Sequence, residues 1–178
     1  MAVLGVGELL KRVREQKLVE GLCERELTNP EGAGFDIRLA EVYKLKGDAF
    51  LGVDERRTPE VETVAKLGEH PHYTLKPGEF VLVRTVESLN LPSDLTAYLL
   101  PRSTLIRSGV HLLWTQAAPG YKGSLTAGMK NLGESSLKLE MGARFAHIQF
   151  YRVEGATTPY RGQWQGGRVS TGGTEKQV

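Results

Sequence analysis

The chain has 178 residues, of which 40% are hydrophobic and 25% charged, so it is long enough for one folded domain with a substantial core. Its formal net charge of +2 gives no strong attraction to nucleic acid or to an anionic membrane, so neither is expected as a partner. A lone cysteine, Cys23, excludes an intrachain disulfide and a cysteine-based metal cage, and is typical of proteins in a reducing cytosol.

The N-terminal segment contains the one strong helix candidate, Gly7 to Lys17. Its apolar residues fall on one face and its charged residues occupy the rest, so we expect an amphipathic helix packed on a sheet edge. The segment lacks the bounded apolar run of a signal peptide, and no stretch of the chain approaches the roughly 18 apolar residues of a membrane helix. These features predict a cytoplasmic protein.

From Phe35 onward, short apolar runs alternate with turn residues. The runs predict strands at Phe35 to Leu45, Glu79 to Thr85, Ser124 to Asn131, Leu137 to Glu140, and Arg144 to Val153. Many short strands at turn-punctuated spacing indicate an all-β sandwich or barrel of jelly-roll character.

Two segments interrupt this pattern. Gly47 to His72 carries many charges and weak periodicity, and is interpreted as an excursion between strands that contains a short β-ribbon. The pair His70 and His72 has no evident third ligand, so no metal site is predicted there. The Gly-rich tail from Ala156 is either disordered or a flexible arm that orders over a phosphate.

The most site-like stretch runs from Pro101 to Gly123. Arg102, Ser103 and Arg107 precede a Pro-Gly turn, and guanidinium and hydroxyl groups together can hold an anion. Tyr121 offers a flat ring that could lie against a sugar or a base. No Asp or Glu occurs between residues 95 and 133, so this stretch has no obvious general base.

Taken together, the segments from about Gly32 to Gly172 resemble the superfamily of dUTPases and dCTP deaminases. The resemblance is carried by five short motifs in the family's order: Ala33–Arg38 (AGFDIR), Pro101–Leu105 (PRSTL), Pro119–Gly123 (PGYKG), Gly142–His147 (GARFAH) and Gly166–Gly172 (GGRVSTG). The fourth motif has His147 where Gln is usual, and the fifth lacks its aromatic residue. Five motifs in order are far more specific than any one of them.

This resemblance implies an all-β fold, a dUTPase-like distorted jelly-roll or β-clip barrel with one N-terminal helix. It implies a helix and lead-in at residues 1–30, a β domain at 31–155 and a flexible Gly-rich C-terminal arm at 156–178. Family members usually form homotrimers with sites at subunit boundaries, so a homotrimer is expected. The expected ligands are dUTP or dCTP, or dTTP as an effector. Mg²⁺ would be held by the nucleotide phosphates, without metal-ligating residues from the protein.

The resemblance also implies a nucleotide-binding set. Arg102 and Ser103 would contact phosphates, and Tyr121 would pack under the deoxyribose and leave no room for a 2′-hydroxyl. The full set is Arg102, Ser103, Thr104, Arg107, Gln116, Tyr121, Asn131, Arg168, Ser170 and Thr171. Without the family resemblance, Arg102 and Ser103 would be expected only to stabilise a turn, and Tyr121 would be expected to be a core residue.

Two departures concern catalysis. Where dUTPases have the Asp that activates water, this chain has Ala118, and where dCTP deaminases have a Glu base, it has Gly128. Neither residue can accept a proton. Two hypotheses therefore stay open: a nucleotide-binding protein of pyrimidine deoxynucleotide metabolism without standard catalysis, or an active dUTP diphosphatase or dCTP deaminase. The second would use a displaced base (Asp36, Glu134 or Glu140) or one from a neighbouring subunit.

Overall fold

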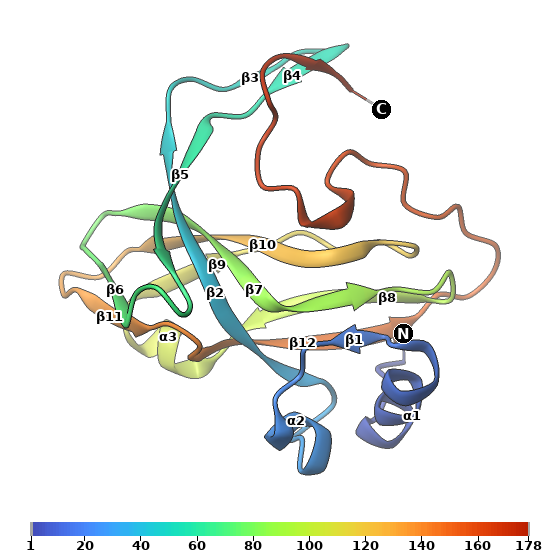
Figure 1. Cartoon of the computed structure of the whole chain (residues 1–178). Coiled ribbons are helices and arrows are strands. Elements are labelled where there is room, and N and C mark those ends of the chain that lie inside the picture. Colours follow the sequence, from blue (N-terminus) through green and yellow to red (C-terminus); the bar gives the residue numbers. More distant parts are fainter. Residues whose placement is uncertain (1, 178) are drawn as a thin grey trace.

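Antiparallel β-strands dominate the computed structural model, which describes residues 2–177 (Figure 1). The helical elements are α1 (Val6–Gln16), α2 (Glu24–Thr28), α3 (Ser103–Arg107) and the 3-10 turn η1 (Gln165–Gly167). The strands are β1 (Val19–Glu20), β2 (Phe35–Lys46), β3 (Phe50–Leu51), β4 (Glu55–Arg57), β5 (Glu60–Lys66), β6 (His72–Leu75), β7 (Phe80–Asn90), β8 (Leu95–Pro101), β9 (Val110–Leu113), β10 (Lys122–Asn131), β11 (Leu137–Glu140), β12 (Arg144–Arg152) and β13 (Glu175–Lys176).

Most of these strands form one curved sheet. Within residues 2–177 its order is β8-β12-β2-β7-β10-β9, with β1 added to β7 and β5 added to β2. An isolated bridge between Ala97 of β8 and Ala117, beyond the end of β9, brings the two edges of the sheet together. The sheet is therefore a nearly closed barrel, and the predicted all-β fold class is confirmed.

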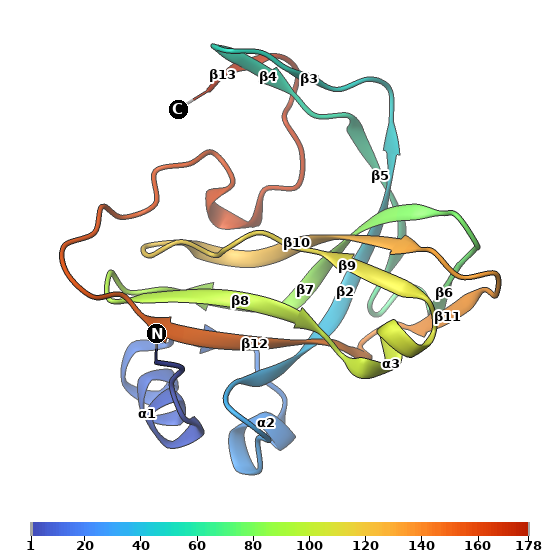
Figure 2. The ribbon, with the colours of Figure 1, turned by 180° about the vertical axis from the view of Figure 1, so that it is seen from behind.

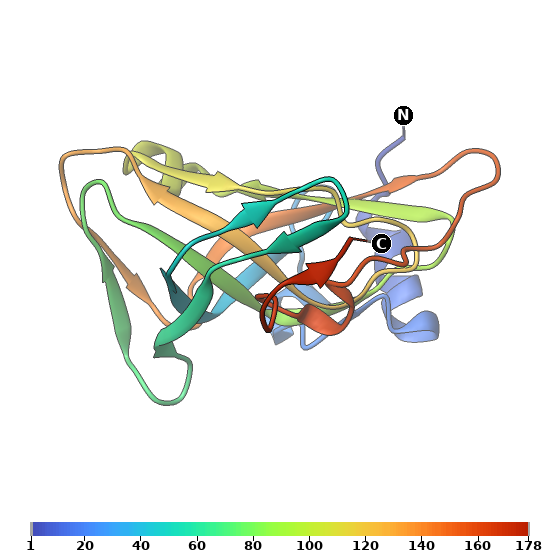
Figure 3. The same ribbon diagram turned by 90° about the horizontal axis from the view of Figure 1, so that it is seen from above.

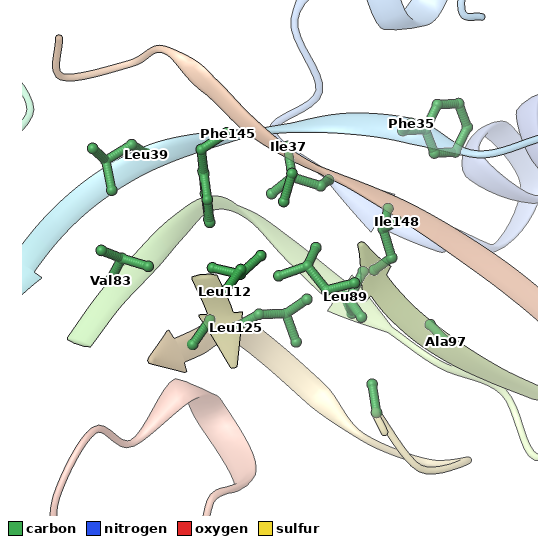
Figure 4. Packing of buried hydrophobic residues seen from close by; sticks show 14 of the residues in the cluster. Phe35, Ile37, Leu39, Val83, Leu89, Ala97, Leu112, Leu125, Phe145 and Ile148 are labelled. Carbon is green, nitrogen blue, oxygen red and sulfur yellow. The ribbon is translucent and has the colours of Figure 1, made fainter. Parts of the chain in front are cut away.

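The barrel is held by one apolar core. Along β7 the side chains alternate between buried and half-buried positions, as expected for a strand with one face on the core. Figure 4 shows buried side chains of β2, β7, β8, β9, β10 and β12 meeting between the strands, among them Phe35, Ile37, Val83, Leu112 and Ile148. The alternating apolar residues of the sequence thus fill the barrel interior.

The predicted N-terminal helix is present as α1, one residue earlier at each end than expected. Lys17 ends it in a left-handed conformation, with φ of 53°. Leu9 is fully buried, and Arg12 on the same helix donates to both carboxylate oxygens of Asp94 at 3.2 and 2.8 Å. The helix therefore packs on the barrel through an apolar face and one forked ion pair.

The strand predictions locate the right segments, and the largest difference is at β7. This strand continues five residues beyond the predicted end at Thr85, to Asn90. The extension is paired on both sides, because Leu89 and Ser88 lie opposite both β1 and β10.

The excursion at Gly47–His72 contains the expected ribbon, a short hairpin of β3 and β4, followed by β5 on the main sheet. The C-terminal segment runs back over the barrel through η1 and ends as β13, which pairs with β4. Figures 2 and 3 show this teal hairpin beside the red C-terminal strand. Among the described residues, none of the helices is long and apolar enough to cross a membrane.

Candidate functional site

A cavity of about 490 Å³ lies between the barrel and the C-terminal segment. Its barrel wall comes from β2, β5, β7 and β10, and the segment Trp114–Ala118 closes one side. Tyr160, Trp164 and Arg168 of the C-terminal segment form part of the lining opposite the barrel. The volume is within the roughly 300–1,000 Å³ typical of small-molecule sites.

The cavity lining contains no carboxylate. Ala118, where a dUTPase-like acid is expected, lines the cavity with a methyl group only. At Gly128, where a deaminase-like acid is expected, an added Cβ would lie 2.9 Å from Cζ of the Phe80 ring. Because Phe80 itself lines the cavity, an apolar ring fills the space that a residue-128 side chain would need.

Two polar atoms in the cavity wall are buried without a hydrogen-bond partner among residues 2–177. They are Nε1 of Trp114 and Oγ1 of Thr126, and both residues line the cavity. Buried polar groups are nearly always satisfied, so these two are available to a bound ligand. Gln116 also lines the cavity, and its amide donates to Oγ1 of Thr96 at 2.6 Å.

Tyr121 forms part of the same wall. Its hydroxyl donates to the Ser124 carbonyl oxygen at 2.6 Å, and burial raises the pKa of the phenol. The Tyr160 ring packs edge-to-face on it, with 5.6 Å between centroids. The ring is therefore fixed in place beside the cavity, in a position suited to support a flat ligand.

The predicted phosphate-binding residues of the C-terminal segment have partners within the chain. Arg168 lines the cavity, and its guanidinium contacts the Glu175 carboxylate at 2.8 Å. Thr171 is buried and forms two hydrogen bonds with Thr58, which lies between β4 and β5. The backbone amide of each residue donates to the side-chain hydroxyl of the other at 2.9 Å. Ser170 is half-buried and accepts a hydrogen bond from Arg168 through its carbonyl.

The second predicted group, from the PRSTL motif, lies elsewhere. Arg102 contacts Asp36 with Nε 3.5 Å from Oδ2, while Ser103, Thr104 and Arg107 are exposed on α3. Asp36 also accepts from Arg144 at 2.9 Å and interacts with Nδ1 of His147 at 3.0 Å. His147, the departure from the family's usual Gln, thus joins a cluster of basic side chains around one carboxylate.

The two groups are far apart in a single chain. Asp36 is the second residue of β2 and Leu45, which lines the cavity, is its second-to-last. Nine residues of extended strand correspond to about 30 Å. Figures 1 and 2 show α3 and the red turn η1 well separated on the barrel. Tyr121 lines the cavity, whereas Arg102 and its neighbours on α3 are not part of the lining.

Asn131 has a structural role in this chain. It is fully buried, its amide donates to the carbonyls of Leu75 and Ser135, and its side-chain oxygen accepts from the Gly133 amide. It is not part of the cavity lining. These three bonds use its polar atoms to hold the turn after β10.

The proposed substitute acids lie outside the cavity. Glu134 and Glu140 are exposed, and Asp36 is already contacted by Arg25, Arg102, Arg144 and His147. Among residues 2–177 no group of three or more His, Cys, Asp or Glu could hold a metal ion. The cationic surroundings of Asp36 do not suit a divalent cation, so any Mg²⁺ would depend on the ligand's own phosphates.

Sequence reasoning did not identify Phe80, Trp114 or Thr126 as site residues. Trp114 lies within Pro101–Gly123 and is followed by the polar residues Thr115 and Gln116. A large aromatic residue in this position was the one sequence feature that could have indicated a binding site. Phe80 and Thr126 face the cavity because of strand register, which local sequence does not reveal.

Comparison with known proteins agrees with this architecture. The sequence model of the dCTP deaminase-like family matches residues 3–153. A dCTP deaminase of Pyrococcus furiosus is 32% identical over 156 residues, covering 87% of this chain and 88% of that protein. A probable deoxyuridine 5′-triphosphate nucleotidohydrolase of Methanothermobacter thermautotrophicus is 34% identical over 140 residues, covering 79% and 89%.

Among solved structures, the 2′-deoxycytidine 5′-triphosphate deaminase of Agrobacterium tumefaciens superposes with a TM-score of 0.64 at 19% identity. The match covers 85% of this chain and 47% of that one, and shows a shared fold. The barrel and its motifs define a protein of the dUTPase and dCTP deaminase superfamily. Within it, the chain belongs to the dCTP deaminase-like family of nucleotide metabolism.

Proposed function

We propose that this protein binds a deoxyribonucleoside triphosphate, dUTP, dCTP or the effector dTTP, and lacks the standard catalysis of its family. The observation that carries the proposal is a cavity with unpaired donors and an aromatic wall but no carboxylate in its lining. A general base has to lie within hydrogen-bond reach of the proton it removes, directly or through one water. Loss of such a base typically lowers the rate about 10²- to 10⁴-fold.

The proposed ligand position follows from the cavity's groups. The nucleoside lies against Tyr121, with its base edge near Trp114 and Thr126, whose free donors support a polar ligand at that wall. The phosphates extend toward Arg168 at the rim. Mg²⁺, where required, is carried by the phosphates.

We also propose that a complete site joins two copies of the chain in a homotrimer. The PRSTL group and the cavity are separated within one chain, and Arg102 with its exposed neighbours Ser103, Thr104 and Arg107 is free to face another subunit. In such an assembly Asp36 or another acid of the neighbouring subunit could supply the base that the cavity lining lacks. This is the second candidate function, an active dUTP diphosphatase or dCTP deaminase.

One pair of measurements separates the two candidates. Purified protein is incubated with dUTP and with dCTP in the presence of Mg²⁺, and release of pyrophosphate and ammonia is followed. We expect neither product above background, whereas turnover at ordinary enzyme rates would refute the loss of catalysis. In parallel, thermal unfolding is followed with dUTP, dCTP, dTTP and UTP, because a ligand selective for the folded state raises the melting temperature. Absence of a shift with every nucleotide would refute the binding proposal itself.

A further inference from the structure

The rim of the cavity contains a carboxylate held by two arginines from distant parts of the chain. Oε1 of Glu175 lies 3.2 Å from Nε of Arg56, and Oε2 lies 2.8 Å from Nη2 of Arg168. Arg56 is on β4 of the excursion and Glu175 is on β13, directly paired with it in the three-stranded sheet. We call Arg56, Arg168 and Trp164 the arginine clamp.

Trp164 positions both guanidinium groups. The Arg56 guanidinium carbon lies 4.9 Å from the indole centroid, and that of Arg168 lies 5.9 Å from it. Cations at such distances are attracted to the aromatic face, which orients them in addition to the ion pairs. Arg56 also donates to the side-chain oxygen of Gln163, one residue before the indole. The two cations are thus pre-positioned side by side.

The clamp is continuous with the cavity. Trp164 and Arg168 line it, and Arg56 and Glu175 lie directly behind them, in contact with Trp164 and Arg168 respectively. The side chains of Arg56 and Glu175 are only 16% and 19% exposed, so the pairing is shielded from solvent. Burial raises the pKa of the Glu175 carboxyl, but hydrogen bonds from Arg168 and Arg56 outweigh it and the pKa is below its ordinary value. The carboxylate is therefore an anion at neutral pH.

Two guanidinium groups that converge on one anion, each on a different oxygen, could equally hold a phosphate group. We propose that the arginine clamp is a phosphate-binding subsite, that Arg56 is a ligand-binding residue, and that Glu175 occupies the subsite when the nucleotide is absent. This inference rests on the proposed function for the nucleoside, and it assigns a role to the excursion. On binding, a phosphate of the nucleotide replaces the Glu175 carboxylate between Arg56 and Arg168.

The test compares ligands with and without phosphates on wild type and Glu175→Gln. Affinities are measured by calorimetry for dUTP and dCTP, for deoxyuridine and deoxycytidine, and for inorganic tripolyphosphate. We expect Glu175→Gln to raise triphosphate and tripolyphosphate affinity about 5- to 10-fold, because the competing charge is gone. Nucleoside affinity should stay within about twofold. Arg56→Gln should lower triphosphate affinity about 10-fold and leave nucleoside affinity unchanged.

A matched control removes the effect of net charge alone. Glu69 lies on the same excursion and pairs with Lys66 at 2.9 Å, outside the cavity lining. Glu69→Gln makes the same change in charge and should leave every affinity unchanged.

The outcomes distinguish a phosphate-binding clamp from an ion pair that only holds the C-terminal segment over the cavity. Equal gains for nucleosides and triphosphates in Glu175→Gln would mean that Glu175 only holds the arm closed, which overturns the phosphate subsite. Unchanged or weaker triphosphate binding in Glu175→Gln, or an Arg56→Gln variant with full affinity, would overturn it as well.

The same data separate this inference from the proposed function. If nucleotides bind but Glu175→Gln has no effect, the clamp fails and the proposed function stands. If no nucleotide binds but tripolyphosphate binds Glu175→Gln more tightly than wild type, the proposed function fails and the anion subsite stands. If no phosphate compound binds either protein, both fail.

Discussion

At the scale of single residues, Gly128 and Ala118, the two positions where the family resemblance implies a catalytic acid, have different surroundings. Phe80 fills the space beside Gly128, whereas Ala118 lies in the cavity wall with room in front of it. The two missing acids are thus not equivalent. One position is blocked by packing and the other is open.

We predict that Gly128→Glu destabilises the protein by about 1–3 kcal/mol, because its Cβ would meet the Phe80 ring and force it to move. Combining it with Phe80→Ala should relieve the clash between the two side chains, which a double-mutant cycle of urea unfolding would detect. Ala118→Asp is the matched control, and its melting temperature should remain close to wild type. An equally stable Gly128→Glu would show that the ring moves freely.

Glu79 illustrates a residue-scale contribution to stability that depends on pH. Its carboxylate accepts from the Tyr73 hydroxyl at 2.7 Å and the Lys76 amide at 2.9 Å, and pairs with Lys44 at 3.1 Å. Burial alone raises the pKa of this carboxyl, but these bonds lower it below its ordinary value of 4.5. A lowered folded-state pKa means that the stabilisation is present above about 4.5 and is lost as the pH falls from there through the folded-state value.

We therefore predict that Glu79→Gln lowers the free energy of unfolding by about 1–2 kcal/mol at pH 7. The difference from wild type should shrink steadily as the pH is lowered below about 4.5. Urea unfolding at pH 7 and at pH 3.5 measures both values. A difference that stays constant across this range would mean that the charge of Glu79 contributes nothing.

At the scale of elements, the excursion and the C-terminal segment act as one unit over the cavity. They are joined by the β4–β13 pairing, the arginine clamp and the exchange of hydrogen bonds between Thr58 and Thr171. These contacts are few compared with those of the barrel core. Local opening of this unit should therefore require less free energy than global unfolding.

We predict that Thr171→Val loosens this unit without affecting the barrel. Valine has a similar shape but cannot accept the hydrogen bond from the Thr58 amide, so opening should become about 5- to 10-fold more frequent. Trypsin cleavage after the exposed Arg161, followed by mass spectrometry, should accelerate by that factor when opening is fast relative to cleavage. The exposed Thr174→Val is the control. An unchanged cleavage rate in Thr171→Val would show that the Thr58–Thr171 hydrogen bonds do not hold this unit closed.

At the scale of the whole molecule, the barrel separates the two halves of the expected nucleotide site. The cavity lies under the C-terminal segment, and Arg102 lies with Asp36 near the opposite end of β2. Within one copy, Arg102 is not part of the cavity lining. Assembly of several copies can bring the two groups together with each barrel intact.

Mixing two defective variants tests this arrangement. Tyr121→Ala impairs the cavity and Arg102→Ala impairs the other group, so neither variant alone should bind nucleotide well. After unfolding and refolding an equal mixture, about a quarter of the sites should combine an intact cavity with an intact Arg102 from another copy. Calorimetry gives the number of active sites, and light scattering tests for the trimer. No recovered binding would contradict a shared site.

By itself, the sequence determined the strand segments, the amphipathic helix and the absence of acids at positions 118 and 128. These features are local: alternation, turn residues and residue identity are legible along the chain. It also placed Tyr121 and the five motifs, and their order was enough to indicate the superfamily.

Only the tertiary structure decided which of these residues meet. Phe80 fills the space at Gly128 because β7 and β10 pair in one register, and a shift by one residue would turn that ring to the other face. Arg56 and Glu175, 119 positions apart, meet because β13 pairs with β4. Arg102 and Tyr121 are only 19 positions apart, yet Tyr121 lines the cavity while Arg102 pairs with Asp36 outside it. Closeness in a β fold is set by strand order and register, which depend on the packing of the whole core.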